Sequence, residues 1–155
     1  MSSVVIAGSR DGVRVQDVMA AIVGSGFSIT ELINGKAPRG ADRIALDWAN
    51  EYLIPVKPFP ADWFTFSNGA GMVRNAEMAT YAKFKSGKVI AVWDFKSSGT
   101  ANMIANAIAQ RLPLYVFDIR NKTGKHVDVD DGYVRGWATR VLAYGFKNRN
   151  KHAAR

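Results

Sequence analysis

The chain has 155 residues and a net charge of +8, and its hydrophobic share of 48% excludes a disordered protein and fits one domain with a sizeable core. Cysteine is absent and the two histidines, His126 and His152, lie in separate segments, so neither a disulfide nor a metal site is expected. No apolar run approaches the roughly 20 residues that span a bilayer, and no signal peptide is recognisable, so we expect a soluble cytoplasmic protein.

The first part of the chain alternates short apolar runs with segments of helical periodicity. The first helical segment stops at Gly24-Ser25-Gly26, and Pro55 and Pro58 indicate that the third apolar run is a short edge strand. The predicted order is strand 4–7, helix 15–23, strand 29–33, helix 41–52 and strand 54–59.

An aromatic loop follows at residues 60–69 and contains Trp63, Phe64 and Phe66. These rings are suited to stacking on a nucleobase, but core residues beneath a long loop are the favoured interpretation. The remaining periodicity predicts helix 71–84, strand 88–93, a helix opened by Ser97-Ser98-Gly99-Thr100, and strand 113–118.

Strands that alternate with helices imply a parallel sheet with right-handed crossovers. We therefore predict an α/β fold, a Rossmann-like three-layer sandwich with a mostly parallel sheet of about five strands, in a domain over residues 1–120. Residues 121–155 are predicted to form a C-terminal extension, in which the aspartates of 128–131 favour a turn and a helix cap. The helix would pack on the domain or on a second subunit through Val134, Trp137, Val141, Leu142 and Tyr144.

A basic tail ends the chain, with Lys147, Arg149, Lys151 and Arg155 and no acidic residue among the last nine positions. Such a tail either stays solvated or holds nucleic acid through the release of counterions. The solvated terminus is the favoured interpretation.

Four predicted loops lie where a ligand binds in open α/β sheets, at the carboxyl ends of the strands. They cover residues 8–10, 35–42, 94–100 and the approach to 71–77. Two of them are glycine-led and carry an arginine, Arg39 or Arg74, next to a helix start, where free amides and the helix dipole attract phosphate. Neither a G-x-G-x-x-G fingerprint nor a P-loop is present.

Each of these features also has a purely structural interpretation. Ser97–Thr100 is either a phosphate site or an ordinary helix cap. Asp42 either caps its helix or binds ligand, and Arg39 is either a phosphate ligand or a solvated turn residue. Arg74 and Glu77, three residues apart, form either a surface ion pair or part of the site.

Five short segments occur in an order that resembles a known family, and each is a weak signal alone. They are Val5-Ile6-Ala7-Gly8-Ser9-Arg10, Arg39-Gly40-Ala41-Asp42-Arg43, Phe59-Pro60-Ala61-Asp62-Trp63, Ala70-Gly71-Met72-Val73-Arg74-Asn75-Ala76-Glu77-Met78 and Ser98-Gly99-Thr100-Ala101-Asn102-Met103. The ordered set resembles the YspA-like branch of the SLOG superfamily, which is common in bacteria and their phages and is related to DprA and the LOG phosphoribohydrolases.

The resemblance implies a nucleotide or nucleotide-derived ligand, of the nucleoside 5′-monophosphate or ADP-ribose type, at the carboxyl edge of the sheet. It implies no further cofactor. The residues expected to bind this ligand are Gly8, Ser9, Arg10, Gly35, Arg39, Gly40, Asp42, Asn75, Ser97, Ser98, Gly99 and Thr100. If the protein hydrolyses an N-glycosidic bond, Glu77, Arg74 and Asp94 are the expected catalytic residues, with Glu77 the first choice because the spacing predicts that it shares a helix face with Arg74.

LOG proteins carry P-G-G-x-G-T-x-x-E, and this chain departs from that motif. Gly99 and Thr100 are retained, whereas Lys96 and Ser97 replace the two glycines and Met103 stands in place of the glutamate. Two alternatives to ligand binding are therefore kept: single-stranded nucleic-acid binding like DprA, and a catalytically inactive interaction or inhibitor protein. LOG relatives form dimers, so the resemblance also implies a homodimer.

Overall fold

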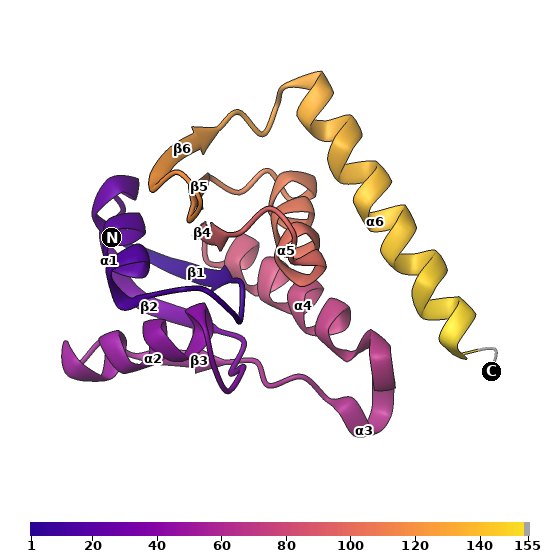
Figure 1. Cartoon of the computed structure of the whole chain (residues 1–155), viewed down its shortest axis with the longest axis horizontal. Coiled ribbons are helices and arrows are strands. Elements are labelled where there is room, and N and C mark those ends of the chain that lie inside the picture. Colours follow the sequence, from indigo (N-terminus) through magenta and orange to yellow (C-terminus); the bar gives the residue numbers. More distant parts are fainter. Residues whose placement is uncertain (154–155) are drawn as a thin grey trace.

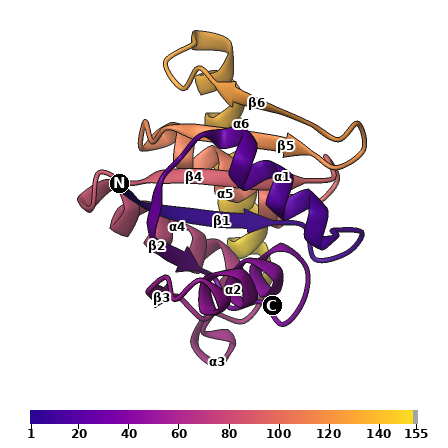
Figure 2. The same cartoon turned by 90° about the vertical axis from the view of Figure 1, so that its left-hand side faces the viewer.

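A six-stranded sheet forms the centre of the molecule, in the order β3-β2-β1-β4-β5-β6 (Figures 1 and 2). The computed structural model describes residues 1–153, with side chains described up to residue 144. The strands are β1 (Ser2–Gly8), β2 (Ile29–Asn34), β3 (Val56–Pro58), β4 (Lys88–Trp93), β5 (Leu114–Asp118) and β6 (Thr123–Val127). The first five are parallel, as predicted, and β3 is the predicted edge strand.

The sixth strand, β6, is antiparallel to β5 and lies in a segment for which the sequence predicts no strand. Four of its five residues are exposed to solvent, so it lacks the apolar run that marks the buried strands. The sheet therefore extends beyond residue 120, and its outer edge carries the polar residues Lys125 and His126.

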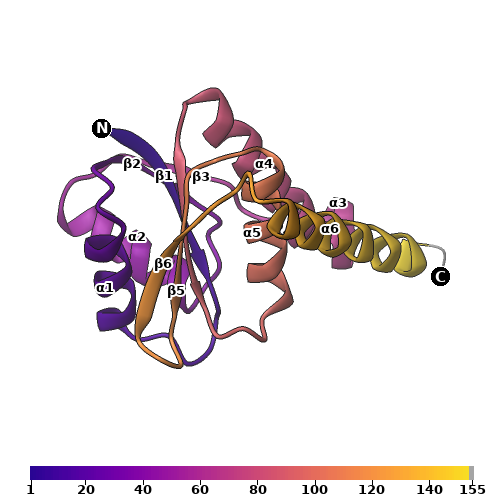
Figure 3. The same ribbon diagram turned by 90° about the horizontal axis from the view of Figure 1, so that it is seen from above.

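Helices cover both faces of the sheet and complete the three predicted layers (Figure 3). Helices α1 (Val15–Ser25) and α2 (Ala41–Glu51) lie on one face, and α4 (Ala70–Phe84) and α5 (Ser98–Ala109) lie on the other. In β1, Val4 and Ile6 belong to the core under α1 and α2, whereas Val5 and Ala7 belong to the core under α4 and α5. Burial on both faces explains why the strand reads as one apolar run.

The predicted loop at 60–69 contains a short helix, α3 (Trp63–Phe66), and a 3-10 turn, η1 (Ser67–Gly69). Asp62 caps α3 by accepting a hydrogen bond from the Thr65 amide at 3.0 Å. The interpretation of the three aromatic residues as core was wrong: Trp63, Phe64 and Phe66 are all exposed. The reason is that α3 stands out from the domain beside the start of α4 and has no sheet beneath it (Figure 1).

The C-terminal helix, α6 (Gly132–Ala153), begins at the predicted cap, where Asp131 accepts a hydrogen bond from the Val134 amide at 3.0 Å. Its first turns pack on the domain through Val134, Trp137, Val141 and Leu142, and Ala138 is buried. The side chains of Lys147, Arg149 and Lys151, and all of Arg155, lie outside the described residues. Among the described helices, none is both long and apolar enough to cross a membrane.

Candidate functional site

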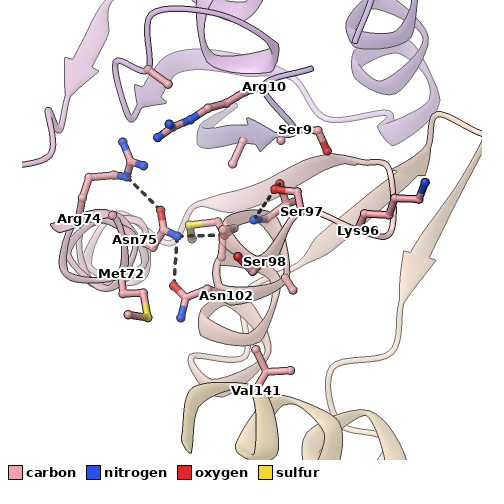
Figure 4. A pocket seen from close by; sticks show the side chains of 18 of the residues that line it. Ser9, Arg10, Met72, Arg74, Asn75, Lys96, Ser97, Ser98, Asn102 and Val141 are labelled. Atoms are coloured by element: carbon pink, nitrogen blue, oxygen red, sulfur yellow. Dashed lines mark hydrogen bonds between the residues drawn. The ribbon is translucent and has the colours of Figure 1, made fainter. Parts of the chain in front are cut away.

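A cavity of about 1090 Å³ opens at the carboxyl ends of β1 and β4 (Figure 4). The strand order reverses between these two strands, which is where open α/β sheets bind their ligands. Figure 4 shows Arg10 and Arg74 on one side of the cavity and Val141 of α6 on the opposite side. Eleven of the predicted residues line it: Gly8, Ser9, Arg10, Asp42, Arg74, Asn75, Asp94, Ser97, Ser98, Gly99 and Thr100.

The N-terminus of α5 opens onto this cavity. The side-chain oxygen of Ser97 accepts hydrogen bonds from the amide of Thr100 at 3.5 Å and from its hydroxyl at 3.2 Å, which confirms the helix cap. The next two amides, of Ser98 and Gly99, belong to the first turn and have no acceptor within the helix. A Cβ atom on Gly99 would meet nothing within 4 Å, so the backbone there is open to a ligand. The helix dipole favours an anion at this position.

Asp94 holds the loop that precedes α5. Its carboxylate oxygen Oδ1 accepts hydrogen bonds from the amides of Lys96 and Ser97, both at 2.8 Å, and its own amide donates to the hydroxyl of Ser9 at 3.1 Å. Desolvation raises the pKa of Asp94, but the hydrogen bonds to the carboxylate outweigh it and hold the pKa below its usual value. Asp94 and Ser9 therefore tie the β4 loop to the β1 loop.

Arg74 is half-buried on α4 and reaches across the cavity to the loop after β2. Its Nη1 donates to the carbonyl oxygen of Gly35, and its Nε donates to Oδ1 of Asn75 at 3.0 Å. Burial lowers the pKa of Arg74, the charge of Asp42 raises it, and the positive charge of Arg10 lowers it further. The positive charges of Arg10 and Arg74 thus repel each other, and an anion between them would offset that repulsion.

Asn75 joins α4 to α5 at the back of the cavity. Its amide nitrogen donates to the carbonyl oxygen of Gly99 and to Oδ1 of Asn102, both at 3.1 Å. Asn102 is buried, and its oxygen also accepts a hydrogen bond from Asn106 at 3.2 Å. This chain of amides fixes the first turn of α5 relative to Arg74.

Asp42 is the buried carboxylate of the cavity, with 7% of its surface exposed. Burial raises the pKa of Asp42, and the amide of Ala37 and the charges of Arg74 and Arg10 oppose that rise. Its Oδ2 accepts a hydrogen bond from the Ala37 amide at 3.1 Å, so the interpretation of Asp42 as a cap for its own helix was wrong. It instead holds the loop after β2 against α2.

A family model described as "YspA, cpYpsA-related SLOG family" matches residues 2–66 of the chain. This part of the chain is therefore similar to the YspA-like branch of the SLOG superfamily. No match to a curated protein was found. The matched part includes the loops at residues 8–10 and 35–42, whereas α4, α5 and α6 lie beyond it.

Three of the four glycines predicted to bind ligand, Gly8, Gly35 and Gly40, have packing roles. A Cβ on Gly8 would clash with the carbonyl oxygen of Val92, and a Cβ on Gly35 would lie 2.6 Å from the guanidinium of Arg74. Gly40 has a φ of 77° and crosses directly over the backbone of the β1 loop. Neither Gly35 nor Gly40 is among the residues that line the cavity. They allow the loops to approach closely, which positions Arg10, Arg74 and Asp42.

Arg39 and Glu77 are not brought into the cavity. Arg39 is exposed and pairs with Asp11 at 3.0 Å, which fits a solvated turn residue. Glu77 is exposed and lines a separate shallow groove with Lys57, Phe59 and Tyr81. Within the described residues, no ion pair joins Glu77 to Arg74. Arg74 and Glu77 therefore face two different depressions of the surface, and the structure gives no support to Glu77 as a catalytic residue beside Arg74.

The pKa shift of Asp42 predicts a pH-dependent effect on stability. A carboxyl whose pKa is raised by folding contributes stability that is complete below its ordinary pKa and is lost as the pH rises through the folded value. Asp42→Asn stays neutral and keeps an oxygen for the Ala37 amide. The melting temperature of Asp42→Asn minus that of the wild type should therefore increase from about pH 4 to about pH 8. Thermal denaturation measures this, and a constant difference would contradict it.

Several residues of the cavity were not predicted as ligand contacts. The polar ones are Asp11, Asn68, Lys96, Asn102 and Arg140, and the large apolar or aromatic ones include Met72, Trp137, Val141 and Tyr144, with Met78 and Met103 buried. Asn102 belongs to the segment Ser98–Met103, but it is neither charged nor a glycine, so its residue type gives no sign of a ligand contact. The α6 residues carried only an amphipathic pattern, which predicts burial and not a ligand contact.

Proposed function

We propose that this cavity binds a nucleotide or a nucleotide-derived ligand, with its phosphate between Arg10, Arg74 and the amides of Ser98 and Gly99. The match of residues 2–66 to the SLOG family supports a nucleotide-type ligand in general. The position at the strand-order reversal supports it independently. The observation that carries the proposal is the arrangement of two arginines that face the open N-terminus of α5 across one cavity.

The charge balance of the cavity also supports an anionic ligand. The lining carries four cations, Arg10, Arg74, Lys96 and Arg140, against three carboxylates. One of these carboxylates, Asp11, is offset by Arg39, which lies outside the lining. A net positive cleft concentrates phosphate-bearing ligands.

Arg10→Ala should weaken the binding of such ligands by about 10-fold, because a charge-assisted hydrogen bond contributes about 1.5–3 kcal/mol when buried and less at an exposed site. Arg10 is exposed, so its loss should leave the melting temperature unchanged. Isothermal titration with the four ribonucleoside 5′-monophosphates and ADP-ribose measures the effect.

Arg43→Ala is the matched control for Arg10→Ala. Arg43 is an exposed arginine that pairs with Asp47 on α2 and does not line the cavity. The substitution Arg43→Ala removes the same charge as Arg10→Ala and should leave the affinity for these nucleotides nearly unchanged. Equal losses in both variants would mean that net charge alone attracts the ligand, and no binding of any of the five compounds to the wild type would overturn the proposal.

N-glycosidic hydrolysis is the second candidate function, and the position of Asp42 favours it. A buried carboxyl with a raised pKa beside two arginines suits general acid catalysis. Asp42 would then take the role first expected of Glu77, while Asp94 positions the loop. Chromatography of the same nucleotides after incubation with the protein tests this, through the release of free base.

A further inference from the structure

The cavity has a second end, formed by α3, the start of α4, and α6, that the phosphate site does not use. Trp63 and Met72 line one side of this end, and Trp137, Arg140, Val141 and Tyr144 line the other. Figure 4 shows Met72 beside Asn102, and Val141 farther from Arg10 than either. These residues are apolar or aromatic, with one arginine, whereas the sheet end is polar and charged.

Helix α6 is held firmly enough to form a wall. Nη1 of Arg135 donates to the carbonyl oxygens of Ile108 and Val129, both at 3.1 Å, and Arg111 pairs with Asp130 at 2.9 Å just before the helix. The ring of Trp137 lies 6.2 Å from that of Trp93 at the end of β4. From this anchored part the helix runs past α5 and away from the sheet (Figures 1 and 3).

The residues that α6 offers to the cavity follow helical spacing. Positions 137, 140, 141 and 144 recur at three and four, which places them on one face of the helix. Tyr144 is 68% exposed and Trp63 is 52% exposed, so neither ring is needed to fill the core. Two large aromatic rings thus line one cavity with much of their surface uncovered.

We propose that α6 and α3 form the base-binding end of the site, so that the ligand is a nucleotide with an aromatic base and not a bare sugar phosphate. This inference rests on the proposed function. Rings, a thioether and a guanidinium all pack favourably on the face of a base. A cavity of about 1090 Å³ also exceeds the upper range of ordinary small-ligand pockets, which leaves space beyond a ribose phosphate.

The contribution of the base can be measured as the ratio of two affinities, for AMP and for ribose 5-phosphate. In the wild type, AMP should bind about 10-fold or more tightly than ribose 5-phosphate, because stacking of one base on an aromatic residue typically supplies this much. Trp63→Ala and Tyr144→Ala should each reduce the ratio several-fold and leave the affinity for ribose 5-phosphate unchanged. Titration calorimetry gives both affinities.

Two matched controls share the helices of the test residues. Phe64 is fully exposed on α3 and Tyr133 is 81% exposed on α6, and neither lines the cavity. Phe64→Ala and Tyr133→Ala should keep the wild-type ratio, and all four variants should keep the wild-type melting temperature. A reduced ratio in the controls as well would overturn the assignment of Trp63 and Tyr144.

The two proposals fail in different ways. If ribose 5-phosphate and AMP bind equally, and Trp63→Ala and Tyr144→Ala change neither, the phosphate site stands and the base-binding end is wrong. If GMP, CMP or UMP shows the base contribution in place of AMP, the same variants should reduce that ratio, and the inference holds with a different base. If none of these compounds and no ADP-ribose binds, the proposed function itself fails, and the inference falls with it.

Discussion

Replacement of Arg74 by alanine should weaken nucleotide binding by about 10- to 100-fold and lower the free energy of unfolding by about 2 kcal/mol, since hydrogen bonds that involve charged groups contribute about 1.5–3 kcal/mol. The dual effect follows from its position. Its guanidinium contacts the carbonyl oxygen of Gly35 and lies near the buried Asp42, while the same group faces the cavity. Titration calorimetry and chemical denaturation measure the two effects separately.

Two further variants separate the charge of Arg74 from its geometry and provide a control on the same helix. Arg74→Lys keeps the charge but loses the planar fork, so it should recover part of the binding and little of the bond to Gly35. Glu77→Gln changes a charge on the same helix outside the cavity and should alter neither quantity appreciably. Wild-type affinity in Arg74→Ala would rule out a phosphate contact there, even if the protein were destabilised.

Replacement of Gly8 by alanine should lower the free energy of unfolding by about 3 kcal/mol or prevent folding, which is the upper range for an overpacked site. The added Cβ would overlap the carbonyl oxygen of Val92 and lie 2.8 Å from the Cβ of Ala41. Backbone and alanine atoms cannot rotate away, so β1, β4 and α2 would have to separate. In a domain of this size, about 3 kcal/mol corresponds to a fall in melting temperature of roughly 6–12 °C.

Gly99→Ala is the matched control for Gly8→Ala. A Cβ at this position on α5 meets nothing within 4 Å. Alanine stabilises a helix interior by about 1 kcal/mol relative to glycine, and the stabilisation is smaller in the first turn. Its stability should equal or slightly exceed that of the wild type, whereas its methyl group would enter the space proposed for phosphate. Similar destabilisation by both substitutions would show that the close contact at Gly8 is not what limits the fold.

Most of the fold followed from sequence because its elements are marked by burial. Strands covered on both faces, such as β1 and β4, are continuous apolar runs, and the amphipathic α2 shows the spacing of a helix with one buried side. The elements that these apolar patterns do not predict are exposed to solvent. Strand β6 is exposed along most of its length, and α3 buries none of its residues, so neither carries an apolar pattern.

The site was harder to predict than the fold, because it depends on how elements cross. Motif spacing identified the loops that meet at the sheet edge, and Arg74 and Ser97–Thr100 do line one cavity. Spacing alone does not tell which side of α4 faces that cavity, and the structure places Glu77 on a side that faces a separate groove. The contacts from α6 to the cavity depend on the angle at which α6 packs across α5, and local sequence does not specify this angle.

The hydrogen bonds that surround the proposed phosphate position have a consequence for the thermodynamics of binding. Asp94 fixes its own loop, Ser9 ties that loop to β1, and Asn75 links α4 to the first turn of α5. The backbone that would contact the ligand is thus ordered before the ligand arrives. Association should cost little conformational entropy at this end, so affinity there should reflect the contacts themselves and the release of water.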